Sequence, residues 1–80
     1  MSRTPHTLAE EFPQQAARIA ELTASDAHFR RIAGEYEAVN EAIHRAETNL
    51  EPTDQFREED LRKARLWLKD EIAQQLAAAA

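Results

Sequence analysis

Large apolar residues recur at every seventh position through the middle of the chain, and a second apolar position follows most of them after three or four residues. The first series is Leu22, Phe29, Tyr36, Ile43 and Leu50, and the second is Ile32, Val39 and Ala46. Alternating spacings of three and four residues form one apolar stripe along a helix that packs against another helix. The pattern therefore predicts a long, coiled-coil-like helix as the main element.

A short helix is expected before this element, over about 7–12. Thr7 and Glu10 match a capping box, in which each side chain bonds to an exposed backbone amide at the start of a helix. Pro13 disfavours helical geometry at the residue before it and suits the first turn of the helix after it. The N-terminal segment is therefore a helical extension that ends or kinks at Pro13.

Two long helices then follow, over about 13–49 and about 54–78, separated by the turn around Pro52. Ser25 and Asp26 are both good N-cap residues, and the phase of the apolar stripe changes beside them. The first long helix could break at this point, but we expect it to continue or to kink.

The second long helix has its own apolar stripe, made of Leu61, Ala64, Leu68, Ile72 and Leu76. Because the connection between the long helices is short, they are expected to lie antiparallel and to pack stripe against stripe. The sequence therefore predicts a single all-α domain over 1–80, an antiparallel helical hairpin with a short N-terminal helical extension.

This hairpin leaves two sets of apolar side chains without a partner. The second long helix is too short to cover the whole stripe of the first, and some apolar residues of the second helix point away from its own inner stripe. The candidate interaction residues are Leu8, Phe12, Ile19, Leu22, Leu66 and Trp67. The N-terminal segment could fold back on its own hairpin or pack on another chain. A second copy of the chain is the simplest cover, so we expect a homodimeric bundle. For Trp67, an intermolecular contact is favoured over packing against a folded-back N-terminus.

The composition agrees with a helical protein and restricts the classes of partner. The chain is 42% hydrophobic but only 6% aromatic, with one glycine, and its formal net charge is −5. Such a charge disfavours binding to nucleic acid or to an anionic membrane surface. The absence of cysteine excludes disulfides and thiolate chemistry. With no apolar run long enough to span a bilayer and no apolar signal core, a cytoplasmic protein without membrane association is expected.

No residue pattern predicts catalysis, a cofactor or a metal ion. Glu41 and His44 have the spacing of a metal-ligand pair on a helix, but they fall on the face opposite the apolar stripe. Paired carboxylates are frequent, yet neighbouring residues of a helix point about 100° apart and a hairpin has no dry cleft. We therefore expect a protein that is not an enzyme and has no catalytic, cofactor-binding or metal-binding residues.

A basic stripe on the second long helix allows two interpretations. It consists of Arg62, Arg65 and Lys69. These side chains could bind phosphates of a nucleic acid, or they could form ion pairs with Glu35, Glu41 or Glu47 across the hairpin. The second interpretation is favoured, because acidic residues face the stripe. The leading functional hypothesis is a small protein-interaction or adaptor protein, and the alternative is a nucleic-acid-associated regulator.

Several runs of residues resemble the YdcH-like family of small bacterial proteins. They are Asp26-Ala27-His28-Phe29, Glu35-Tyr36, Leu61-Arg62-Lys63-Ala64-Arg65-Leu66 and Leu68-Lys69-Asp70-Glu71-Ile72. The last run, following a basic stretch, is the most specific part. The resemblance implies a bacterial, cytoplasmic helical hairpin prone to coiled-coil packing. It implies no activity, because the family is a domain of unknown function.

Overall fold

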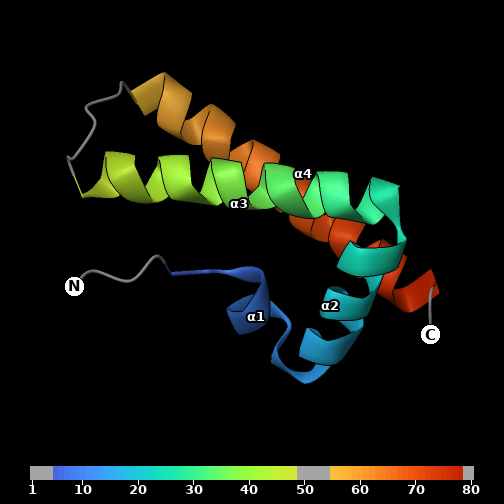
Figure 1. The fold of residues 1–80 in the computed structure, drawn as a ribbon. Helices are drawn as coiled ribbons and strands as arrows, with labels where there is room; N and C mark the ends of the chain where they lie inside the picture. The colour runs from blue at the N-terminus through green and yellow to red at the C-terminus, as the bar shows by residue number, and fades with distance from the viewer. Residues whose placement is uncertain (1–4, 49–54, 79–80) are drawn as a thin grey trace.

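Two long helices form the body of the molecule, and a bent N-terminal part lies against them (Figure 1). The computed structural model describes residues 5–48 and 55–78. In the second range, side chains are described from residue 57 onward. The long helices are α3, Ala27–Glu47, and α4, Gln55–Ala78. They pack closely on each other as an antiparallel hairpin. The predicted all-α hairpin is confirmed.

The N-terminal part consists of three short elements, α1 (Leu8–Glu11), the 3-10 helix η1 (Pro13–Gln15) and α2 (Ala16–Ser25). The side chain of Thr7 accepts a hydrogen bond from the Glu10 amide at 3.4 Å, as a capping box requires. The Glu10 carboxylate bonds to the amide of His6 at 3.1 Å instead of returning to Thr7. The confirmed N-terminal helical extension therefore begins with half of the predicted capping box.

The core lies where the two apolar stripes meet. Its fully buried side chains include Phe29 and Tyr36 of α3 and Ile72 of α4. The cluster around them also contains Ile32, Ala33, Leu68 and Leu76. Burial of each large side chain contributes about 1.5–3 kcal/mol. The predicted stripes therefore supply the core of the hairpin.

The N-terminal part folds back on this core. Leu8 is 4% exposed and belongs to the same cluster, and Phe12, Ile19 and Leu22 pack against it. Of the two alternatives that the sequence left open, the structure therefore shows the fold-back, and these four side chains have apolar partners within the chain. The sharp turn between α2 and α3, visible in Figure 1, brings them back to the hairpin.

This turn also corrects the expectation of a helix that continues or kinks at residues 25–26. Asp26 is extended (φ −122°, ψ 108°), and its carboxylate accepts from two amides in the first turn of α3, at 3.0 and 3.1 Å. The guanidinium of Arg30 donates to the carbonyls of Thr23 and Ala24 at the end of α2, at 2.9 and 3.3 Å. Both helix ends are thus satisfied by side chains, which makes a full break favourable.

Other sequence expectations concern single residues. Pro13 begins η1, so the α-helix resumes only at Ala16. Gly34, inside α3, has open space beside it, because a Cβ at this position would meet nothing within 4 Å. The turn expected around Pro52 lies outside the described residues. Among the helices that are described, none has the length and apolar character needed to cross a membrane.

Candidate functional site

One side of α4 is exposed along its length, opposite the stripe that packs on α3. Its members are Glu59, Lys63, Leu66, Trp67, Asp70, Ala73, Gln74 and Ala77, and we refer to them as the outer face of α4. Leu66 is 61% exposed and Trp67 is 60% exposed. They are the exposed large apolar side chains of the described part of the chain. Of the six candidate interaction residues, these two alone present most of their surface to solvent.

The basic stripe borders this face and is tied to other parts of the same chain. Arg62 forms ion pairs with Glu47 at 3.1 Å and with Glu58 at 3.7 Å. Arg65 donates to the side-chain oxygen of Asn40 at 2.9 Å. The contact with Glu47 is one that the cross-hairpin interpretation predicts. The partner of Arg65 is an amide that the sequence did not indicate.

Lys69 bonds to Glu11 at 2.9 Å, a residue of the N-terminal segment. Glu35, one of the three carboxylates expected to pair with the basic stripe, pairs instead with Arg31 of its own helix at 3.7 Å. The difference follows from the fold-back of the N-terminus, which places a carboxylate beside α4. Each member of the basic stripe therefore has a polar partner within the chain.

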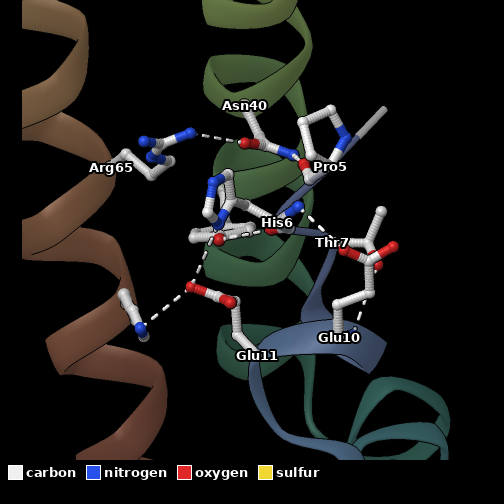
Figure 2. A network of polar contacts seen from close by, with 9 residues as sticks. Pro5, His6, Thr7, Glu10, Glu11, Asn40 and Arg65 are labelled. Atoms are coloured by element: carbon white, nitrogen blue, oxygen red, sulfur yellow. Dashed lines mark hydrogen bonds and ion pairs between the residues drawn. The ribbon is translucent and has the colours of Figure 1, made fainter. Parts of the chain in front are cut away.

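Two side chains of α3 bond to the backbone of the segment 5–12, which we call the N-terminal strap (Figure 2). The hydroxyl of Tyr36 donates to the carbonyl of His6 at 2.6 Å. The side-chain amide of Asn40 donates to the carbonyl of Pro5 at 2.8 Å. Since Asn40 also accepts from Arg65, it joins the strap, α3 and α4 at one buried point.

Glu11 forms the second junction between the strap and α4. Its carboxylate lies between Lys69 and the ring of His6, whose Nδ1 is 3.6 Å away. The hydrogen bond from Lys69 is the main cause that lowers the pKa of Glu11. Burial raises the pKa of the Tyr36 phenol, and the nearby negative charge of Glu11 adds to the effect. The tyrosine thus remains a neutral donor to the strap.

Two hollows adjoin these elements. One of about 200 Å³ lies beside the strap, and its walls are formed by His6, Glu11, Tyr36, Arg62, Arg65, Leu66 and Lys69. Another of about 380 Å³ lies among α1, α2 and α3, beside Gly34 and Ile19. In the first, the tyrosine, glutamate and lysine are bonded to the chain itself. Within residues 5–48 and 55–78, no three histidine or carboxylate side chains are grouped as metal ligands.

Comparison with known proteins assigns the hairpin to a family. Residues 29–76, more than half of the chain, match the model of a family described as "Protein of unknown function (DUF465)". The YdcH-like proteins that the sequence resembles belong to this family. The chain matches no curated protein and no solved structure. The matched range covers almost all of α3 and most of α4, including Tyr36, Asn40 and the outer face up to Gln74. The chain thus belongs to the DUF465 family of proteins of unknown function.

Proposed function

We propose that this protein is a non-enzymatic interaction module that binds another protein through the outer face of α4. The observation that carries the proposal is the exposure of Leu66 and Trp67, side by side, in a chain whose other described large apolar side chains are at least partly buried. An exposed apolar pair with charged residues around it is typical of a protein contact. Tryptophan is also enriched among the residues that dominate binding energy.

The shape of the surface favours a helix as the partner element. The outer face runs along one side of α4 and offers small side chains, Ala73 and Ala77, toward its C-terminal end. Small residues allow a second helix to approach closely, and the ridge of larger ones can enter the grooves of that helix. A helix-on-helix contact is thus the mode that the face suits.

The contacts of the polar side chains near the hollows are consistent with a structural role for these side chains. Tyr36 donates to the backbone of the strap, and Glu11 and Lys69 bond to each other. Each of these contacts holds the strap on the hairpin. This structural role explains the polar side chains without assigning them to catalysis. The proposal of a protein without catalysis rests on these assignments.

The alternative function, a nucleic-acid-associated regulator, gains no support from the contacts of the basic stripe. Arg62 and Lys69 pair with carboxylates and Arg65 with an amide, so phosphate binding would have to replace these partners. The net charge of −5 also opposes approach of a polyanion. We therefore propose the protein contact alone.

Site-specific photo-cross-linking tests the proposal. A chain carrying p-benzoylphenylalanine in place of Trp67 is expressed in the cells that make the protein and is irradiated. We expect a cross-linked protein adduct from this position, and none from the same group placed at the exposed Ala38 of α3. Adding Leu66→Glu should abolish the adduct. The absence of an adduct at position 67, or an adduct that Leu66→Glu leaves unchanged, would contradict the proposal.

A further inference from the structure

We infer that the partner of the outer face of α4 is a second copy of this chain, bound antiparallel about a two-fold axis that passes between Leu66 and Trp67. This inference rests on the proposed function and adds the identity and orientation of the partner. It is carried by the arrangement of charged, apolar and neutral residues on the exposed face.

The charges of this face are complementary to the same face turned end for end. Lys63 and Asp70 lie near its centre line, each ~5 Å along the helix axis from the midpoint between Leu66 and Trp67. A two-fold axis at that midpoint places Lys63 of one chain opposite Asp70 of the partner subunit, and it does so twice. Among the described residues, neither side chain takes part in an ion pair within the chain. Both charges are therefore available to a partner.

The apolar pair occupies the centre of the same arrangement. At ~100° per residue, Leu66 and Trp67 lie on either side of the line through Lys63 and Asp70. Turning the helix over about the axis brings each Leu66 beside the other Leu66, and each Trp67 beside the other Trp67. The two exposed apolar side chains are thus covered by their own copies, with two ion pairs flanking them.

Further along the face, no like charges are brought together. Glu59 comes level with Gln74 of the partner subunit, which is neutral. A parallel arrangement would instead place Lys63 against Lys63 and Asp70 against Asp70. Like charges at an interface suppress that arrangement, so the charge pattern selects the antiparallel one.

Charge reversal combined with sedimentation equilibrium tests the inference on the full chain. Lys63→Asp and Asp70→Lys each create two like-charge contacts in the proposed dimer, and each should weaken self-association by about tenfold. The double variant Lys63→Asp/Asp70→Lys restores two opposite-charge contacts, and so does an equimolar mixture of the two single variants. Both should recover the association of the natural chain. Arg31→Asp on α3, which changes the net charge as Lys63→Asp does, should leave the association unchanged.

The outcomes separate this inference from the proposed function. Circular dichroism on the same samples establishes that each variant remains helical. A natural chain that stays monomeric up to about 1 mM would overturn the inference. If position 67 still cross-linked to a different protein, the proposed function would nevertheless hold. A dimer that is insensitive to the single reversals, or that neither the double variant nor the mixture rescues, would also overturn the inference.

Discussion

The side chain of Asn40 links three parts of the structure, namely the strap, α3 and α4, so its loss should weaken the contacts among all three. It is 3% exposed, donates to the Pro5 carbonyl at 2.8 Å and accepts from Arg65 at 2.9 Å. Asn40→Ala removes both hydrogen bonds and leaves the backbone of α3 intact. The strap then loses one of its two side-chain contacts from α3 to a backbone carbonyl, and α4 loses its link to this point.

The expected cost follows from the kind of each bond. A neutral hydrogen bond contributes about 1 kcal/mol, and a bond to a charged group contributes about 1.5–3 kcal/mol. Pro5 is exposed and Arg65 is partly exposed, so water can reach both groups after the substitution. We therefore take the low end of these ranges and expect a loss of about 2–3 kcal/mol in the free energy of unfolding. A domain of 80 residues has about 4–12 kcal/mol in total, so the effect should be easily measured.

Urea unfolding followed by circular dichroism, at one fixed protein concentration, gives this free energy. Hydrogen exchange of the amides in α1 reports separately whether the strap is released. Asn40→Asp is the matched control for the two bonds, because it keeps an acceptor for Arg65 and removes the donor to Pro5. It should speed exchange in α1 as Asn40→Ala does, while the hairpin amides stay protected.

The reasoning would be refuted by a loss below about 0.5 kcal/mol for Asn40→Ala together with unchanged exchange in α1. Such a result would mean that Tyr36 and the buried side chain of Leu8 hold the strap without the amide.

Three further predictions concern other positions. Gly34→Ala should raise the free energy of unfolding by about 0.4–1 kcal/mol, measured in urea, because a Cβ there meets open space and alanine favours the helix. Asp26→Ala should lower it by about 1 kcal/mol through loss of the α3 cap, whereas Asp26→Asn should lower it by less than half as much. The lowered pKa of Glu11 makes its ion pair stabilising above the ordinary value of 4.5, and this stability is lost as the pH falls through the lower folded pKa. Lys69→Met should therefore flatten the dependence of stability on pH below 4.5, by under about 1 kcal/mol because Lys69 is partly exposed; an unchanged slope would contradict this.

The hairpin could be predicted from the sequence because its determinants are periodic. The seven-residue spacing of Phe29, Tyr36 and Ile43 places them on one side of a helix, and Leu68 and Ile72 repeat the pattern on the next. All five are buried in the structure. The exposure of Trp67 follows from the same periodicity, since it falls outside the stripe of its helix.

The fold-back of the N-terminus could not be predicted in the same way. It depends on the backbone torsion angles of Asp26. An N-cap residue indicates that a helix begins, but it does not indicate the direction of the preceding helix relative to the new one. The ion pair between Glu11 and Lys69 is a consequence of that direction. The bonds to Pro5 and His6 use carbonyl oxygens, which every residue carries, so no sequence signal marks them.

Recognition of carbonyl oxygens has a consequence for sequence variation in the strap. Tyr36 and Asn40 contact atoms that do not change when the side chains at positions 5 and 6 change. Position 5 should therefore accept most residues. Position 6 is restricted by its backbone conformation, because His6 has a φ of 61°, where glycine and asparagine fit and β-branched residues do not. Its ring also lies 3.6 Å from the Glu11 carboxylate, a contact that most replacements would lose. The strap can thus diverge in sequence while the hairpin residues that bind it stay the same, and a saturation library over positions 5 and 6 would show this as two different tolerance profiles.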